Sequence, residues 1–376
     1  MEVIFRCGLV LAVAVSAVAD AQVATERCVV PSPLPTIGDI KPTVDGRLLL
    51  AIPGGRRVEL VTPSRDARMR LGPQLGARAE LESVGATGEL SDGYWVFDDR
   101  ADLVAQFSLR GILRRAMSLT PPAGMRFAAM VDSRRALWLP EFATHGRRES
   151  EAGRVAMIAD ADGSDADTLL QLSPAVPRVQ VAMANATIEV PNWFDDSPVV
   201  AVSPRATFLV VVDRRISPAV AVDSLRVTII DLRNGGTERR AVPYRVRQVP
   251  AALLDSLVTS EAAHLSAHVG HDDEVMQLSA RRRILVAALP AYHGWRTVAS
   301  ALVDDDGDVY LEREYTDSRM SRHYQRWRRG ATAPVPLDVP ANLRVRAVGN
   351  GSMYAVSRAR DENCAIWRLP LGSGGR

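Results

Sequence analysis

Two adjacent carboxylates, Asp98 and Asp99, stand at the end of the aromatic and β-branched run 94–97. A carboxylate pair can act as general acid and general base, or it can bind a cation. Asp also suits tight turns, because its side chain hydrogen-bonds the local backbone and tolerates unusual dihedral angles. The polar residues 98–101 separate two strand-like segments, so we interpret Asp98 and Asp99 as a hairpin corner.

Equivalent corners recur along the chain when its segments are aligned as the repeats described below. In that alignment the corner position is occupied by Asp98, Glu141, Asp213, Arg313, Pro53 and Ser357. Carboxylates that gather on one face of a folded ring could bind a cation or a basic group. We therefore take Asp98, Glu141, Asp213 and Arg313 as candidate ligand-binding residues, although a turn role is the simpler interpretation of the acidic ones.

Three histidines form the cluster that most resembles a metal site. His264, His268 and His271 are spaced so that a helix would align them on one face, where imidazoles can bind zinc. The zinc-peptidase pattern needs Glu directly after the first His, and Leu265 stands there instead. Gly270 would also weaken the helix. We favour a solvated helix face and keep zinc as the alternative.

Three further motifs have structural interpretations. The segment DADGSDAD (160–167) resembles a calcium loop, but its glycine is misplaced and position twelve is Gln171, so a hairpin turn is favoured. The basic and aromatic segment 319–330 could bind single-stranded nucleic acid, but alternation on an outer strand explains it equally well, and we expect no nucleic acid partner. In the long connection 190–202, Trp193 and Asp195 are candidate ligand contacts over a channel, with packing as the alternative for Trp193.

The elements that would position these residues repeat along the chain. In 83–119 a short inner strand, a turn, an apolar strand, a polar corner, another strand, another turn and a last strand follow one another, which makes four antiparallel strands. The order from the first turn onward recurs in 45–72, 132–173, 203–243, 304–340 and 349–372, and the last of these units stops after its third strand. A period of about 40–50 residues with four strands is typical of a propeller blade. We predict an all-β, six-bladed β-propeller of four-stranded antiparallel blades, with an irregular β-sandwich or two β domains as alternatives. An amphipathic helical insertion is expected near 250–289.

The last unit lacks its outer strand, and the strand-like segment 24–30 near the N-terminus can supply it. Cys28 lies in that segment and Cys364 lies in the third strand of the last unit. Neighbouring antiparallel strands bring Cα atoms within the distance that a disulfide requires. We predict a Cys28–Cys364 disulfide that locks the ring where it closes, with two free buried thiols as the alternative.

The N-terminal segment indicates export. The apolar stretch 7–19 is too short to span a membrane, and Ala19-Asp20-Ala21 offers the small residues that a signal peptidase reads. We expect a signal peptide at 1–21, a single propeller domain at 22–376, no membrane span after cleavage, and a periplasmic or secreted protein. The formal net charge of +2 gives no argument for nucleic acid.

The chain resembles exported bacterial six-bladed propellers of the TolB-like and NHL-repeat superfamily. The resemblance covers roughly 35–372 and is carried by GYWVFDDRADLVAQFSLRGILRRAMSL (93–119) and ALVDDDGDVYLEREY (301–315). The superfamily includes ligand and protein binders, metal-dependent lactonases and lyases, and its lactonase-like members hold an axial metal with Glu, Asn and Asp. The first strand of the first unit offers only Asp39 toward such a set, so no catalytic residue is carried over.

Together these features favour a non-enzymatic binding scaffold for a protein, peptide or small ligand at the channel mouth. We expect a monomer in the cell envelope or outside it, with no resident cofactor. The alternative is a metal-assisted hydrolase or lyase with calcium or zinc on the propeller axis. A third interpretation is a structural partner in an envelope complex that uses its arginine-rich outer edges.

Overall fold

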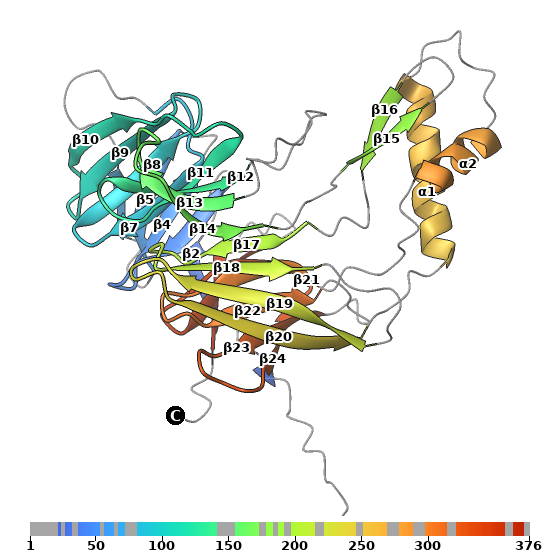
Figure 1. The fold of residues 1–376 in the computed structure, drawn as a ribbon. Helices are drawn as coiled ribbons and strands as arrows, with labels where there is room; N and C mark the ends of the chain where they lie inside the picture. Colours follow the sequence, from blue (N-terminus) through green and yellow to red (C-terminus); the bar gives the residue numbers. More distant parts are fainter. Residues whose placement is uncertain are drawn as a thin grey trace, which may run out of the picture.

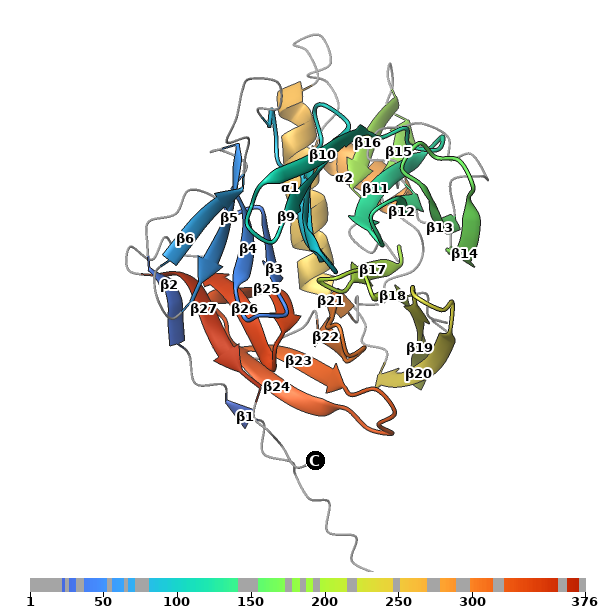
Figure 2. The same cartoon turned by 90° about the vertical axis from the view of Figure 1, so that its left-hand side faces the viewer.

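The computed structural model describes the chain over residues 22–23, 27–31, 37–52, 56–63, 67–71, 81–140, 155–172, 178–182, 187–191, 197–214, 222–245, 251–268, 278–288, 298–313, 321–357 and 364–371. Within these residues, six sheets of four antiparallel strands are arranged in a ring (Figures 1 and 2). The fold is a six-bladed β-propeller, which confirms the prediction from the repeats.

The first three blades follow one another directly in the sequence. Blade 1 contains β3 (Asp39–Pro42), β4 (Leu48–Ile52), β5 (Arg57–Thr62) and β6 (Ala67–Leu71). Blade 2 contains β7 (Ala86–Leu90), β8 (Gly93–Asp98), β9 (Leu103–Ser108) and β10 (Leu113–Ser118). Blade 3 contains β11 (Met125–Met130), β12 (Arg135–Pro140), β13 (Val155–Asp160) and β14 (Asp167–Gln171).

The remaining blades include two strands from the N-terminal part of the chain. Blade 4 contains β17 (Val199–Val202), β18 (Phe208–Asp213), β19 (Val222–Asp231) and β20 (Thr237–Arg245). Blade 5 contains β21 (Val298–Val303), β22 (Val309–Arg313), β23 (Ser321–Trp327) and β24 (Val335–Pro340), and β1 (Gln22–Val23) pairs in parallel with β24. Blade 6 contains β25 (Leu343–Gly349), β26 (Ser352–Ser357), β27 (Cys364–Pro370) and β2 (Arg27–Pro31).

The first strand of each blade lies nearest the propeller axis, where first strands of neighbouring blades contact one another. The second strands are mostly apolar because they pack against blades on both sides, and all five residues of β4 are buried, whereas β8, β18 and β22 each end in a charged residue. Outer strands are far more exposed, as β10 shows. Aromatic side chains fill the seam between blades 2 and 3, where the Trp95 and Phe127 ring centroids are 5.4 Å apart.

The ring closes by joining the two ends of the chain. Strand β2 pairs antiparallel with β27 as the fourth strand of blade 6. A disulfide joins Cys28 to Cys364, with their Cα atoms 5.8 Å apart. Val30 of β2 is fully buried in the apolar cluster between blades 6 and 1. The predicted disulfide therefore lies at the closure and ties two ends that are separated by 336 residues in sequence.

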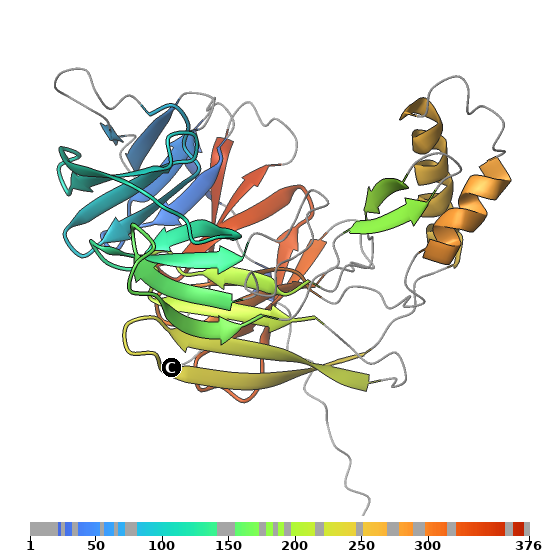
Figure 3. The same ribbon diagram turned by 45° about the horizontal axis from the view of Figure 1, so that its top comes forward.

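Two insertions leave the ring between blades 3 and 4 and between blades 4 and 5. The first is a hairpin of β15 (Arg178–Ala182) and β16 (Thr187–Pro191), and the second contains α1 (Ala251–His268) and α2 (Leu278–Ala288). Figures 1 and 3 show these elements together, away from the ring, and α2 contacts β15. Val258 and Ala262 of α1 and Leu285 of α2 are buried. The helical insertion was predicted, whereas the hairpin was not.

Neither helix could cross a bilayer, since no helix among the described residues combines the required length and apolar character.

Candidate functional site

Because all six blades share one strand order, equivalent connections of all the blades lie on the same face of the ring. The inner-turn face carries the turns that join first to second strands, such as 43–47 in blade 1 and 304–308 in blade 5. The corner face carries the corners that join second to third strands, together with the connections between blades. The candidate ligand residues predicted from the sequence lie on the corner face, where second strands end.

Asp98 on the corner face is a structural residue. Its side chain is only 1% exposed. Oδ2 accepts a hydrogen bond from the backbone N–H of Glu82 at 2.6 Å, and Oδ1 accepts from Ser83 at 3.2 Å. Oδ1 also accepts from the backbone of Arg100 and Ala101 at 3.1 and 3.2 Å. These four donors tie the corner to the segment that enters blade 2, which supports the interpretation of Asp98 as a corner residue.

The other predicted site residues are only partly described. Asp213 and Arg313 are half-buried and end the second strands β18 and β22, as the repeat alignment expected. Glu141, Trp193, Asp195 and His271 lie outside the described residues. His264 and His268 lie one turn apart on α1, but their side chains also fall outside the description.

The described residues contain no group of three or more His, Cys, Asp or Glu side chains that could hold a metal ion. Segment 160–167 forms the β13–β14 hairpin, closed by a 2.8 Å bond from the N–H of Gly163 to the carbonyl of Asp160, which confirms the predicted turn. Residues 321–327 form β23, the third strand of blade 5, so the prediction of an outer strand for this segment was wrong. Strand β24 covers it, because this blade continues by one more hairpin.

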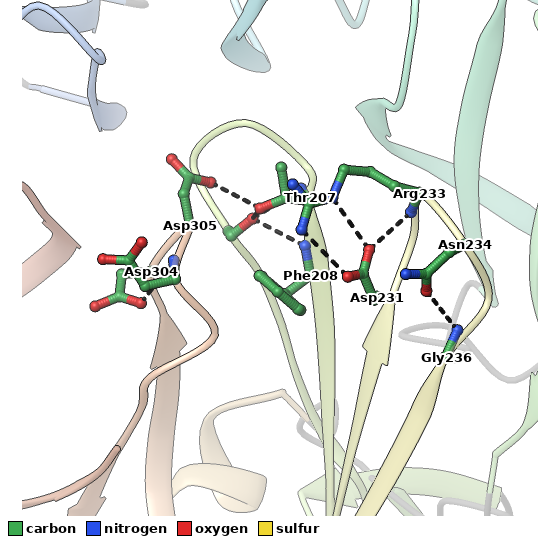
Figure 4. Close-up of polar contacts among 10 residues, drawn as sticks. Thr207, Phe208, Asp231, Arg233, Asn234, Gly236, Asp304 and Asp305 are labelled. Carbon is green, nitrogen blue, oxygen red and sulfur yellow. Dashed lines mark hydrogen bonds and ion pairs between the residues drawn. The ribbon is translucent and has the colours of Figure 1, made fainter. Parts of the chain in front are cut away.

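The inner-turn face carries a polar network that the sequence did not identify as a site (Figure 4). Asp305 in the blade 5 turn accepts the backbone N–H of Arg205 at 3.0 Å and the hydroxyl of Thr207 at 3.1 Å. Both partners belong to the blade 4 turn, where Ser203 Oγ accepts the N–H groups of Thr207 and Phe208 at 2.9 and 3.0 Å. The carboxylate of Asp305 thus joins two neighbouring inner turns.

Asp304 holds the blade 5 turn from inside. Its Oδ1 accepts the N–H groups of Asp306 and Asp308 at 3.1 and 2.9 Å, and its Oδ2 accepts the hydroxyl of Tyr310 at 3.1 Å. The side chain is 7% exposed. This burial raises the pKa of Asp304 to about 6, and the neighbouring charge of Asp308 acts in the same direction. Asp304 is therefore a carboxyl group that changes charge close to neutral pH.

Arginines surround this network on its outer side. Asp308 Oδ2 accepts from Nε and Nη2 of Arg326 at 3.0 and 2.8 Å. The guanidinium groups of Arg233 and Arg329 lie 5.5 and 5.1 Å from the ring centroid of Phe208, within the range of cation–π attraction. Figure 4 shows Arg233 beside Asp231, which accepts two hydrogen bonds from its guanidinium. The cations here already have partners.

Glu89 differs from the other carboxylates of the inner-turn face. It lies near the end of the first strand β7 and is 8% exposed. Its Oε2 accepts the N–H of Val44 in the blade 1 turn at 2.9 Å, and no described residue donates a hydrogen bond to Oε1. Burial raises the pKa of Glu89, the charge of Arg205 lowers it, and those of Asp45 and Asp305 raise it. Charged groups from blades 1, 2, 4 and 5 therefore act on one another at this mouth of the channel.

The blade 1 turn completes this mouth. Arg47 donates from Nε to Asp45 at 2.6 Å and from Nη2 to the hydroxyl of Tyr94 at 2.7 Å. Burial opposes ionisation of Asp45, but hydrogen bonds from Arg47 and Thr43 outweigh it and lower the pKa of Asp45. Arg47 is thus already neutralised by Asp45, and Val44, which precedes Asp45 in this turn, is 62% exposed.

The inner-turn mouth, defined by Val44, Asp45, Glu89, Arg205 and Asp305, combines one buried and incompletely hydrogen-bonded carboxylate with two further carboxylates. Such an arrangement favours a positively charged group. The signal in the sequence was a carboxylate inside the short apolar strand ATGEL (86–90), where a strand buried between blades would otherwise be apolar. Its partners could not be identified from spacing, since they come from other blades.

Comparison with known proteins shows the fold and no more. No family model and no curated protein matches the chain. Among solved structures, a member of the DUF4221 family from Bacteroides vulgatus has a TM-score of 0.50 at 7% identity, covering 93% of this chain and 97% of that one. Streptogramin B lyase has a TM-score of 0.43 at 10% identity, and the match covers 93% of this chain and 98% of the lyase chain. The calcium-binding protein regucalcin from Agrobacterium tumefaciens has a TM-score of 0.38 at 9% identity, covering 92% and 93%.

Proposed function

We propose that the protein is an extracytoplasmic binding scaffold whose inner-turn mouth binds a guanidinium or ammonium group on a peptide or protein partner. The observation that carries the proposal is Glu89, a buried carboxylate with one oxygen bonded to Val44 and the other without a described donor. The Cys28–Cys364 disulfide supports an oxidising compartment, because structural disulfides persist outside the cytosol.

The energetics of Glu89 favour a cationic ligand. A carboxylate removed from water loses hydration, and a single backbone N–H replaces only part of it. A ligand cation at Oε1 would replace the rest through a charge-assisted hydrogen bond, which is about twice as strong as a neutral one. Asp305 adds negative charge nearby, whereas Asp45 is paired with Arg47 and Arg205 supplies one positive charge, so three carboxylates stand against two arginines. The exposed Val44 can contact the aliphatic stem of an arginine or lysine.

The same geometry favours binding over catalysis at this mouth. Asp304 has a pKa suited to general acid–base work, but three donors occupy its oxygens and its side chain is buried. Asp305 is held by Arg205 and Thr207. Both of these donors use Oδ1 of Asp305, so Asp305 Oδ2 and Glu89 Oε1 each lack a described donor, and Glu89 is the one of these two carboxylates that is buried.

The test compares Glu89→Gln with a matched control. Gln is nearly isosteric and keeps an acceptor for the Val44 N–H, so the variant removes charge and little else. Glu82→Gln makes the same change on an exposed residue of the same blade, at the corner face. Binding is measured by calorimetry with acetylated, amidated glycine-rich hexapeptides that carry one arginine, one lysine or, as the neutral probe, one glutamine.

We expect the arginine and lysine peptides to bind and the glutamine peptide to fail. Glu89→Gln should weaken cationic binding by about tenfold or more, in line with the loss of one charge-assisted hydrogen bond. Glu82→Gln should change it by less than about twofold. Equal affinities for all three peptides, or equal losses in the two variants, would overturn the proposal.

A further inference from the structure

The first strands that surround the axis contain three β-bulges. The pairing register shifts between Phe127 and Ala129 in β11, between Val298 and Ser300 in β21, and between Val345 and Ala347 in β25. The extra residues are Ala128, Ala299 and Arg346. A bulge bends its strand and re-aims the side chain of the extra residue, and bulges are common next to binding sites. Two of these residues are alanines, so Arg346 is the one among them that places a functional side chain on a strand next to the axis.

Among the described residues, no carboxylate forms an ion pair or hydrogen bond with Arg346, although the charge of Asp39 acts on it. Its neighbours Val345 and Ala347 are buried in the apolar clusters toward blade 5 and blade 1. The Nε atom of Arg346 is buried and has no hydrogen-bond partner among the described residues. Burial lowers the pKa of Arg346, and the like charge of Arg344 lowers it further, while Asp39 raises it. A buried guanidinium N–H without an acceptor is costly, so this arrangement calls for an anion.

Two other cations lie on the same part of the channel wall. Arg344 precedes Arg346 by two residues and is exposed although it lies on an innermost strand, so solvent reaches this stretch of the wall. Lys41, the only lysine of the chain, lies on the neighbouring first strand β3, and its side chain is 25% exposed. The two strands end side by side, where Asn350 donates to the carbonyl of Thr43 at 2.8 Å.

One carboxylate accompanies these three cations. Asp39 lies 3.7 Å from Lys41 Nζ, longer than a good hydrogen bond, and is itself partly exposed. The wall formed by β3 and β25 therefore carries an excess of positive charge. This wall and Glu89 lie at different levels of the channel. Asp39 and Arg344 lie at the starts of their strands, toward the corner face, whereas Glu89 lies near the end of its strand, toward the inner-turn face.

We infer that Arg344, Arg346 and Lys41 form a second binding site, inside the channel between blades 6 and 1, for the carboxylate or phosphate group of a small molecule. The planar guanidinium of Arg346 can bind two oxygens of such a group at once, and its Nε would then be satisfied. The site lies on innermost strands and is reached along the axis, which selects a small anion. This inference goes beyond the proposed function, because it concerns a different ligand and different residues.

The experiment titrates the oxidised protein with inorganic phosphate and, separately, with citrate by calorimetry at constant ionic strength, with sodium chloride as the reference. The two arms distinguish a phosphate ligand from a carboxylate ligand. Arg346→Gln removes the charge and keeps a side chain of similar length. Arg126→Gln is the control, because Arg126 is also an arginine on an innermost strand, β11 of blade 3, but is exposed.

We expect at least one anion to bind, with affinity reduced about tenfold or more by Arg346→Gln and less than about twofold by Arg126→Gln. Lys41→Gln changes a partly exposed residue and should reduce the affinity for the anion by a smaller factor. This variant replaces Arg346→Gln in the test if Arg346→Gln does not fold. Absence of binding by the unchanged protein, or equal losses in Arg346→Gln and Arg126→Gln, would overturn the inference. These titrations contain no cationic ligand, so their failure is distinguishable from failure at Glu89.

Discussion

Replacing Asp304 with Asn should stabilise the protein at neutral pH. The pKa of Asp304 rises from an ordinary 3.8 to about 6 in the folded chain, chiefly because burial disfavours the charged form. A carboxyl group with a raised folded pKa favours folding at low pH, and that contribution is lost as pH rises through the folded value. At about 1.4 kcal/mol for each pKa unit, the full contribution is about 3 kcal/mol, of which about 2–2.5 kcal/mol is lost between pH 4 and pH 7.5.

The asparagine variant keeps most of the local hydrogen bonds. Its Oδ1 can accept the N–H groups of Asp306 and Asp308, and its amide can donate to the Tyr310 oxygen. The variant has no charge to bury, so its own contribution does not change with pH. The free energy of unfolding of Asp304→Asn, minus that of the unchanged protein, should therefore increase by about 2–3 kcal/mol from pH 4 to pH 7.5.

The measurement is urea unfolding followed by tryptophan fluorescence, at several pH values and without reductant. Taking the difference between the two proteins removes the opposite trend from carboxylates with lowered pKa, such as Asp45 and Asp231. Asp308→Asn serves as the control, because it breaks the pair with Arg326 and should lower stability at neutral pH. A difference for Asp304→Asn that stays constant with pH would refute the reasoning.

Two further predictions concern the corner face and the closure. Asp98→Ala should lower the free energy of unfolding by about 3 kcal/mol, because four backbone donors lose their acceptor at a buried site; a loss below about 1 kcal/mol in urea unfolding would contradict this. The double variant Cys28→Ser and Cys364→Ser should lose about 2–4 kcal/mol. Reduction of the unchanged protein should give the same loss, and an unchanged unfolding midpoint after reduction would show that the bond does not stabilise the closed ring.

The sequence by itself determined the blades, because a blade is defined by local features. Strand-like runs, polar corners such as 98–101 and Asp-Gly turns repeat within short windows, and each unit can be recognised without knowing its neighbours. The Cys28–Cys364 bond was predicted from the same pattern, since the spare strand near the N-terminus can supply the strand that the last unit lacks and pairing of these strands brings the two cysteines together. The helical insertion was also local, a long segment with helical periodicity.

The tertiary structure alone decided where polar groups converge. Glu89 and Asp305 act on one another only because ring closure brings inner turns of distant blades to one mouth. Asp98 became a backbone-binding residue because the segment entering blade 2 passes over its corner. The bulge at Arg346 depends on how β25 pairs with β26, and a shift of one residue would direct another side chain to the axis. Periodicity specifies which residues form a strand, whereas contacts across the axis depend on how all six sheets pack against one another.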